Sequence, residues 1–322
     1  MRLKRSLFFI GIFLICLFSC SKKKGEAKSQ TLTIFHAGSL SIPFKEISAE
    51  FKKVNPTVNI LLEAAGSRTC ARKIADLKRP CDVMASADYT VINTLLIPDH
   101  ADWNIKFASN EMTIVYHDGS KKADEINRDN WYTVLLDKDV AFGRSDPNAD
   151  PCGYRAVLTM KLAEKFYNEK GLAESMQQKD VDYIRPKETD LLALLESNTI
   201  DYLFLYRSVA QQHGLKFILL PDEINLKKPE LTEYYSDATV EISGKKPGTT
   251  VTKKGAPMVY GITIPKNAPN RELAEKFVAF VLTKEKGMQV MEKNGQPSMV
   301  PAPSKTFEKI PEALKGFALA EG

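Results

Sequence analysis

Short apolar runs and longer amphipathic stretches alternate along most of this chain, and that alternation is what most restricts its fold. The first three runs, which have the composition and length of strands, lie at 32–35, 57–63 and 82–86. Two stretches with helical spacing, 42–53 and 68–77, separate them. Strands that alternate with helices in this way need crossover connections, so we expect an α/β fold with largely parallel strands.

A second set of elements in the same order occupies the middle of the chain. Strands are expected at 139–143, 182–185, 201–205 and 216–220, and helices at 154–170, 189–197 and 208–213. Two longer strand-like runs, 107–116 and 257–265, stand on either side of this set. We infer that the chain leaves one lobe, builds a second and returns. The hinge is then expected in the two crossings, near Ile114 and near Tyr260.

These crossings give the expected domain boundaries. Lobe one comprises 31–113 together with 258–322, and lobe two comprises 114–257. A polar stretch at 222–255, rich in Lys, Gly and Pro, is expected to be an exposed excursion with a solvated face. One long amphipathic helix is expected at 271–293.

The N-terminus indicates export. Three cations precede an apolar run at 7–18, which is too short to span a membrane and is typical of a signal peptide. A small residue, then Cys20, then a polar segment at 21–30 resemble the lipobox and tether of bacterial lipoproteins. Residues 1–20 are therefore expected to be a lipoprotein signal peptide that ends at a lipidated Cys20. The alternative is an ordinary signal peptide in which Cys20 is incidental.

Charge and cysteine content exclude some classes of protein. Loss of the leader lowers the formal net charge from +5 to about +2, so no nucleic-acid surface is indicated. The cysteines that follow Cys20 are Cys70, Cys81 and Cys152, an odd number for an exported chain. A disulfide between Cys70 and Cys81 is one option. No Cys/His group has the spacing of a zinc site.

Three expected loops of lobe one place a small residue and a hydroxyl group between a strand and a helix. Their serines are Ser39, Ser67 and Ser86. Hydroxyl groups, main-chain N–H groups and helix dipoles at one edge of a sheet would bind a small, fully ionised oxyanion. Each serine taken alone is better explained as a helix N-cap, and it is the three together that favour an oxyanion site.

The corresponding loop of lobe two, at 145–155, carries a carboxylate. Asp150 precedes a predicted helix start, where it would repel an ordinary anion. Glu188 has a similar place before the next predicted helix. Either residue could simply cap its helix, and this alternative is open from the sequence.

Six segments of the chain form a specific pattern. They are His36-Ala37-Gly38-Ser39-Leu40, Glu63-Ala64-Ala65-Gly66-Ser67, DVMASADY at 82–89, DPCGYR at 150–155, PMVYGITIPKNAPN at 257–270 and NGQP at 294–297. Together they resemble the tungstate/molybdate-binding proteins of ABC importers, in particular the type first known from archaea. The likeness implies a type II periplasmic-binding-protein fold, with two doubly wound lobes, two crossing segments and a ligand cleft between the lobes.

Carried over position by position, the resemblance implies an oxyanion site that both lobes share. The expected oxyanion-binding residues are Gly38, Ser39, Ser67, Ser86, Pro151, Cys152 and Tyr206. Asp150 and Glu188 are expected to reach the tungsten or molybdenum centre itself, because such a centre accepts further oxygen donors. Sulfate and phosphate offer no such centre, so the two carboxylates would select against them.

The resemblance also implies that the protein has no catalytic activity and no cofactor. It implies a monomer that is anchored to the membrane by a lipid and delivers its ligand to permease and ATPase subunits. Two other functions stay open. A receptor for sulfate, thiosulfate or phosphate would have no use for two ionised carboxylates. An exported hydrolase would use Ser39 or Ser67 with His36 or His117, although the sequence has no Gly-x-Ser-x-Gly motif.

Overall fold

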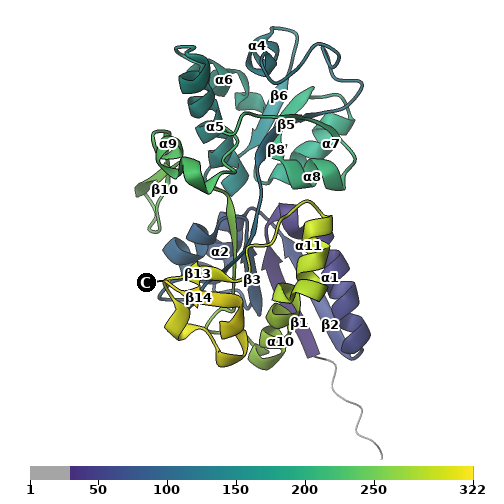
Figure 1. Ribbon diagram of the computed structural model, residues 1–322, viewed down its shortest axis with the longest axis vertical. Helices are drawn as coiled ribbons and strands as arrows, with labels where there is room; N and C mark the ends of the chain where they lie inside the picture. The colour runs from purple at the N-terminus through teal and green to yellow at the C-terminus, as the bar shows by residue number, and fades with distance from the viewer. Residues whose placement is uncertain (1–29, 322) are drawn as a thin grey trace, which may run out of the picture.

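The computed structural model describes residues 30–321, which form two α/β lobes arranged along the long axis of the molecule (Figure 1). The predicted signal peptide at 1–20, with Cys20, lies outside the described residues, as does the predicted tether except for Gln30, which begins the first strand. Within 30–321, no helix has the length and apolar character needed to cross a membrane.

The first sheet has the strand order β2-β1-β3-β12-β4. Its strands are β1 (Gln30–His36), β2 (Val58–Ala64), β3 (Val83–Ser86), β4 (Ile105–Ser109) and β12 (Val259–Thr263). β1 is parallel to β2 and β3, whereas β12 is antiparallel to β3 and β4. The helices of this lobe are α1 (Ser41–Val54), α2 (Ser67–Ala75), α3 (Tyr89–Val91), α10 (Arg271–Leu282) and α11 (Gln289–Lys293). A short pair, β13 (Ala302–Ser304) and β14 (Ala318–Ala320), lies near the C-terminus (Figure 1).

The second sheet has the order β7-β6-β8-β5-β9. Its strands are β5 (Met112–Tyr116), β6 (Phe142–Ser145), β7 (Ile184–Arg185), β8 (Tyr202–Tyr206) and β9 (Lys216–Leu219). Its helices are α4 (Trp131–Leu136), α5 (Pro151–Tyr167), α6 (Leu172–Lys179), α7 (Leu191–Glu196) and α8 (Arg207–Gln212). In each sheet the strand that follows a crossing, β5 or β12, runs antiparallel to its neighbours. The predicted fold of two α/β lobes joined by two crossings is confirmed.

The strand-like run predicted at 107–116 is two strands that belong to different sheets. β4 ends at Ser109, and Met112 at the start of β5 already pairs with Tyr206 of the second sheet. The chain crosses at 110–111 because Asn110 is buried between the lobes, where its side-chain amide donates to the hydroxyls of Ser208 and Tyr260. Ile114, the predicted hinge, therefore lies inside β5.

The helix predicted at 271–293 is broken. Between α10 and α11, Lys286 has φ −125° and ψ −105°, outside the helical region. Gly287 lies so close to the main chain of Val281 that a Cβ atom there would be 2.3 Å from its carbonyl oxygen. This close approach depends on tertiary packing, so the apolar spacing of the segment does not reveal it.

The possible disulfide between Cys70 and Cys81 is not formed. Cys70, Cys81 and Cys152 are all buried free thiols. The Cys70 thiol donates to the carbonyl of His36, whereas the Cys81 thiol donates to that of Val83. Burial raises the pKa of Cys70 to about 12, so it stays a neutral thiol.

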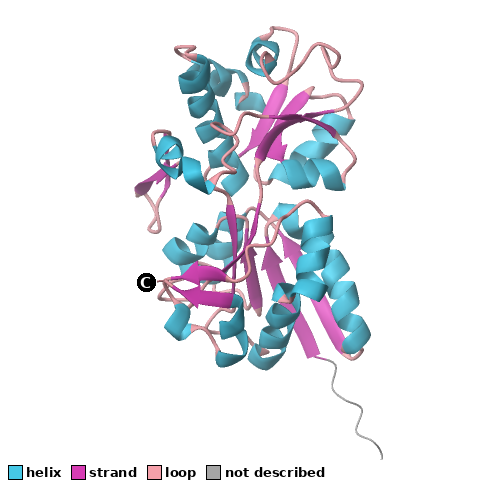
Figure 2. Cartoon of the chain, viewed as in Figure 1, coloured by secondary structure: helices cyan, strands magenta, loops and turns pink. Residues whose placement is uncertain are grey.

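The polar stretch predicted as an exposed excursion contains a short helix, α9 (Thr232–Ser236), and a hairpin of β10 (Thr239–Ser243) and β11 (Thr250–Lys254). The hairpin stands at the side of the molecule next to both lobes (Figure 2). Lys161 of α5 donates to the Thr239 carbonyl, and Arg68 of α2 donates to the Ser243 side chain. Part of this stretch therefore bridges the lobes.

Candidate functional site

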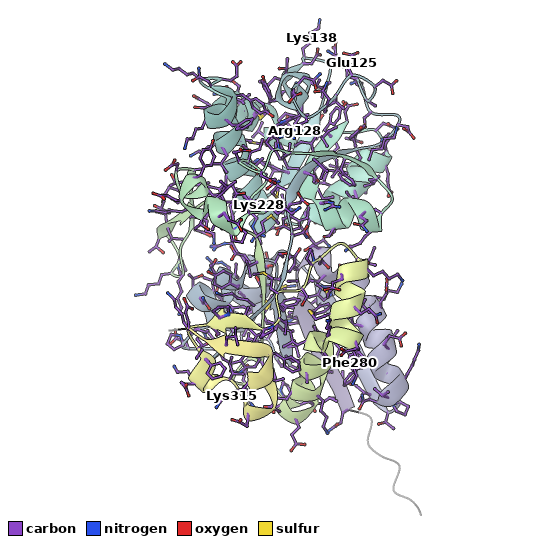
Figure 3. All side chains as sticks on the ribbon, in the orientation of Figure 1. Glu125, Arg128, Lys138, Lys228, Phe280 and Lys315 are labelled. Carbon is purple, nitrogen blue, oxygen red and sulfur yellow. The ribbon has the colours of Figure 1, made fainter. Side chains whose placement is uncertain are left out.

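The charged groups that matter for a ligand lie at the interface between the lobes. Exposed charges such as Glu125 and Lys138 are at the end of lobe two that is remote from lobe one (Figure 3). At the interface, by contrast, Asp88, Asp150 and Glu188 are at most 4 % exposed. Three buried carboxylates between two lobes need partners, and their partners differ.

The predicted site residues come from equivalent places, each just after a strand of one of the two sheets. Lobe one contributes Gly38 and Ser39 after β1, Ser67 at the start of α2 and Ser86 at the end of β3. Lobe two contributes Asp150, Pro151 and Cys152 at the start of α5, Glu188 in the 3-10 turn Glu188–Asp190, and Tyr206 at the end of β8.

Two glycines of lobe one allow its loops to approach the two carboxylates of lobe two. A Cβ atom on Gly38 would lie 2.8 Å from both carboxyl oxygens of Glu188. A Cβ atom on Gly66 would lie 2.4 Å from the Ala149 carbonyl oxygen and 3.0 Å from the Cβ of Asp150. The lobes are therefore closed on each other at the candidate site. A side chain at position 66 would clash with the Ala149 main chain, and one at position 38 would displace the Glu188 carboxyl group.

Asp150 is the N-cap of α5, which begins three residues before the start that the sequence predicts. Its Oδ1 accepts the main-chain N–H of Cys152 at 3.2 Å, and its Oδ2 accepts that of Glu188 at 3.0 Å. The capping alternative therefore holds for Asp150, although a carboxylate oxygen has further lone pairs to offer.

The Glu188 side chain has no such structural role. It does not cap the turn that it opens, and neither of its carboxyl oxygens has a hydrogen-bond partner in residues 30–321. Burial, and then the nearby charge of Asp150, raises the pKa of Glu188 well above its usual value. A buried carboxyl group without hydrogen-bond partners costs at least about 1–3 kcal/mol.

Ser39 is held as a hydrogen-bond donor by a buried polar network. The Tyr260 hydroxyl accepts from the amides of Asn110 at 2.9 Å and Gln296 at 3.3 Å. It must then donate its own proton, and Ser39 Oγ accepts it at 2.9 Å. The Ser39 hydroxyl proton is left for another acceptor.

Two more hydroxyl groups are arranged in the same way. Ser67 Oγ accepts the main-chain N–H of Ala87 at 2.9 Å. Tyr206 Oη accepts from Nη1 of Arg155 at 2.9 Å. In each case the oxygen is already an acceptor, so its proton is directed elsewhere. Three hydroxyl donors therefore accompany the two carboxylates.

The other predicted contacts are placed differently. The Ser86 hydroxyl donates to the Asp88 carbonyl at 2.6 Å and accepts the Asp88 N–H at 3.1 Å, so it is used within its own turn. Pro151 has no N–H, and the N–H of Cys152 is taken by Asp150. These three positions offer a ligand less than Ser39, Ser67 and Tyr206 do.

The arrangement does not suit a hydrolase. Among the described residues, no histidine ring is hydrogen-bonded to Ser39 or Ser67. His36 contacts the Ala37 carbonyl at 2.8 Å, and burial lowers its pKa to about 4. His117 contacts the Leu195 carbonyl. Neither ring is placed to activate a serine.

A second charged cluster at the interface was not predicted. Asp88 Oδ2 accepts from the Tyr154 hydroxyl at 2.5 Å and from Lys253 Nζ at 2.7 Å, and Arg155 lies 3.8 Å away. Burial opposes ionisation of Asp88, but the charges of Lys253 and Arg155 hold its pKa well below its usual range. A pocket of about 300 Å³, lined by these four residues among others, lies beside the cluster.

Signals for this cluster are present in the sequence. Arg155 ends the segment DPCGYR, and Lys253 belongs to the polar stretch 222–255, for which the sequence predicts a solvated face. Likewise Asn110, inside an apolar run, and Gln296, inside NGQP, mark the network that holds Ser39. Buried polar residues at such places point to tertiary hydrogen bonds.

A closed pair of α/β lobes with polar groups buried between them defines a two-lobed ligand-binding protein. The sequence matches the family of bacterial extracellular solute-binding proteins over residues 32–296, and the chain belongs to that family. It is a family of exported receptors that serve transporters rather than of enzymes, which rules out the hydrolase alternative.

Individual relatives agree with this assignment. A protein of Petrotoga mobilis, described as an uncharacterized solute-binding protein, is 49 % identical over 290 residues, with 89 % of each chain covered. The molybdate/tungstate-binding protein WtpA of Pyrococcus abyssi is 41 % identical over 340 residues, which cover 97 % of this chain and 96 % of the relative. Among solved structures, the periplasmic molybdate-binding protein of Azotobacter vinelandii has a TM-score of 0.57 at 13 % identity, with 82 % of this chain and 98 % of that chain covered. At that identity the likeness shows the fold alone.

Proposed function

We propose that this protein captures tungstate or molybdate between its lobes and delivers it to the permease of an ABC importer. The observation that carries the proposal is the buried Glu188 carboxyl group, which has no hydrogen-bond partner within residues 30–321 and lies beside Asp150. A tungsten or molybdenum centre can accept carboxylate oxygens as additional ligands, whereas the sulfur of sulfate cannot. The printed name of the Pyrococcus abyssi relative supports the same ligands.

In this proposal the hydroxyl groups and the carboxylates contact different parts of the ligand. Ser39, Ser67 and Tyr206 donate to the oxo oxygens, since each hydroxyl has a proton with no acceptor in the described part of the chain. Asp150 and Glu188 approach the metal centre. Gly38 lets the first loop come close, and Pro151, Cys152 and Ser86 complete the walls through their main chain.

Delivery follows from opening and closing of the lobes. We place the lobe boundaries and the hinge at the crossings, 110–111 and 255–258, since no sheet includes these residues. A bound ligand would hold the loops of Gly38 and Gly66 against lobe two and so favour the closed form. A permease can distinguish that closed form from the open one.

The N-terminal segment completes the proposal. Lipidation of Cys20 would hold a monomeric receptor at the cell membrane and raise its effective concentration near the permease and ATPase subunits. Mass spectrometry of membrane-extracted protein tests this part, because a diacylglycerol-modified Cys20 has a characteristic mass increase. An unmodified N-terminus at another residue would contradict it.

Titration calorimetry on the purified protein tests the ligand. We expect tungstate to bind tightly, molybdate to bind equally or more weakly, and sulfate to give no measurable heat. Sulfate is the matched control, since it has the same charge and tetrahedral shape but no centre that accepts carboxylates. Equal affinity for sulfate and tungstate would overturn the proposal, as would a different element in ligand that copurifies with the protein.

A further inference from the structure

Arg155 is a buried cation that donates directly to one of the predicted oxyanion donors, Tyr206. It lies in the first turns of α5, five residues after Asp150, and is 3 % exposed. One nitrogen, Nη1, donates both to Tyr206 Oη and to the main-chain carbonyl of Ala87, each at 2.9 Å. The guanidinium group therefore contacts both lobes at once.

The bond to Tyr206 sets the direction of a proton. A phenol hydroxyl has one proton to donate, and the oxygen of Tyr206 already accepts from Arg155. Within residues 30–321 that hydroxyl donates to nothing, although the side chain is fully buried. Burial also raises the pKa of Tyr206 well above its usual value, so the proton stays on the oxygen. Arg155 thus holds Tyr206 as a donor toward the site.

The charge of Arg155 matters as well. A doubly charged oxyanion placed beside Asp150 and Glu188 gathers negative charge in a region from which water is excluded. The Arg155 guanidinium carbon lies 5.6 Å from the centroid of the Tyr206 ring, and its charge also acts on the neighbouring Cys152. It is partly shared with Asp88, which lies 3.8 Å away.

The second bond ties this arrangement to closure. Ala87 follows β3 in lobe one, and its own N–H donates to Ser67 Oγ at 2.9 Å. Its carbonyl accepts from Arg155 of lobe two. The Ala87–Ser67 bond lies within lobe one and the Arg155–Tyr206 bond lies within lobe two. The bond from Arg155 to the Ala87 carbonyl joins them, so the two donors are linked to each other only when the lobes are closed.

Resting on the proposed function, we infer that Arg155 is a positioning residue for oxyanion binding: it directs the Tyr206 proton at the ligand, supplies positive charge, and couples Tyr206 to the Ser67 loop across the closed interface. It acts through Tyr206 and through its field rather than as a direct ligand. A lysine could supply the charge but not the planar group that reaches two acceptors.

The test compares Arg155→Gln, Arg155→Lys, Tyr206→Phe and the double variant Arg155→Gln/Tyr206→Phe by titration with tungstate. We expect Arg155→Gln to weaken tungstate binding about 100-fold, because the variant loses a positive charge and the group that directs the Tyr206 proton. We expect Tyr206→Phe to weaken it about tenfold, because the variant loses one hydrogen bond to a charged ligand. The double variant should bind within about twofold of Arg155→Gln, since Tyr206 without Arg155 is no longer directed at the ligand. Arg155→Lys should recover part of the loss.

A spectroscopic readout separates positioning from general damage to the fold. Tungstate should perturb the near-ultraviolet absorbance of Tyr206 in the unmodified protein, and that difference signal should be absent from both Tyr206→Phe and Arg155→Gln. Arg72→Gln is the matched control, since Arg72 also donates across the interface, to the Gly244 carbonyl at 2.7 Å, but touches no predicted donor. If Arg155→Gln does not fold, Arg155→Lys and Tyr206→Phe carry the test.

Either of two results would overturn the inference while leaving the proposed function in place. One is a double variant whose loss of tungstate affinity equals the product of the two single-variant losses. The other is an Arg155→Gln protein with full affinity and an intact difference signal. Failure of the unmodified protein to bind tungstate would instead overturn the proposed function.

Discussion

Two buried carboxylates at the same lobe interface, Asp88 and Glu188, have opposite surroundings. Asp88 accepts hydrogen bonds from Tyr154 and Lys253 and has Arg155 nearby, and its pKa is held well below the usual range. Glu188 is equally buried, has no hydrogen-bond partner among the described residues, and has a strongly raised pKa. Burial alone therefore does not decide the state of a carboxyl group; its neighbours do.

The difference separates two tasks that a closing receptor must perform. The Asp88 cluster is complete within the protein, so it can stabilise the closed form whether or not a ligand is present. The Glu188 cluster is incomplete, so closure around it is favourable only with something that accepts its oxygens. We expect substitutions at Glu188 to change recognition and substitutions at the Asp88 cluster to change closure.

The largest effect is expected for Glu188→Gln. Replacement of the carboxyl group by an amide removes one predicted ligand of the metal centre, so tungstate affinity should fall at least about 100-fold. The ligand-free protein should be as stable as before or more stable, because a neutral amide is cheaper to bury than an unpaired carboxyl group that can ionise. Calorimetric titration and thermal unfolding measure the two quantities.

Glu196→Gln is the control for that experiment, since Glu196 is exposed at the end of α7, only eight residues away. It should change neither quantity. A Glu188→Gln protein that binds tungstate normally but unfolds at a much lower temperature would mean that Glu188 is structural, and the contrast with Asp88 would be lost.

Much of the fold could be predicted because the apolar periodicity is local. β1, α1 and β2 begin and end within two residues of their predicted positions, since their own sequence decides which face is buried. The errors arise where distant residues decide. Asn110 divides an apolar run because its partners are Ser208 and Tyr260. The predicted long helix is broken between α10 and α11, where Gly287 packs directly against the Val281 main chain.

The serines of lobe one indicate an oxyanion site on their own, whereas the two carboxylates could be predicted as ligands only through the resemblance to a family. Without that resemblance, helix capping is the better explanation of both Asp150 and Glu188. The structure separates them, since Asp150 caps α5 and Glu188 caps nothing. The Asp88 cluster was missed because its members are far apart in the chain: Lys253 and Asp88 are separated by 165 residues. No local pattern encodes such a pair.

Asp150 should give an intermediate effect, because it combines a structural bond with a predicted ligand role. Asp150→Ala loses both, so we expect about a 30-fold weaker tungstate affinity and a ligand-free stability lower by about 1 kcal/mol. Asp150→Asn also loses the charge but can still accept the Cys152 N–H, so its affinity should fall similarly while its stability falls less. Chemical denaturation and titration of both variants separate the two roles. Full affinity in Asp150→Asn would mean that Asp150 is a cap only.

The smallest effect is expected for Lys253→Met, which removes one cation from the Asp88 cluster. The Lys253 side chain is 20 % exposed, and Asp88 keeps Tyr154 and Arg155. Loss of a partly screened ion pair should therefore weaken tungstate binding only about fivefold. The loss should come from the closed form, since Lys253 reaches Asp88 only when the hairpin lies against lobe one. Small-angle X-ray scattering of the ligand-free protein should then show a larger radius of gyration in the variant.

Lys254→Met controls for the loss of a positive charge from the same strand, because the Lys254 side chain is exposed and has no hydrogen bond or ion pair among the described residues. It should leave both the affinity and the scattering curve unchanged.

High salt sharpens the contrast between the two clusters further. Screening should reduce the difference between Lys253→Met and the unmodified protein, whereas the deficit of Glu188→Gln should persist because its site is closed to solvent. If Lys253→Met weakens tungstate binding as much as Glu188→Gln, and does so without opening the lobes, then both clusters serve recognition and the division between them is wrong.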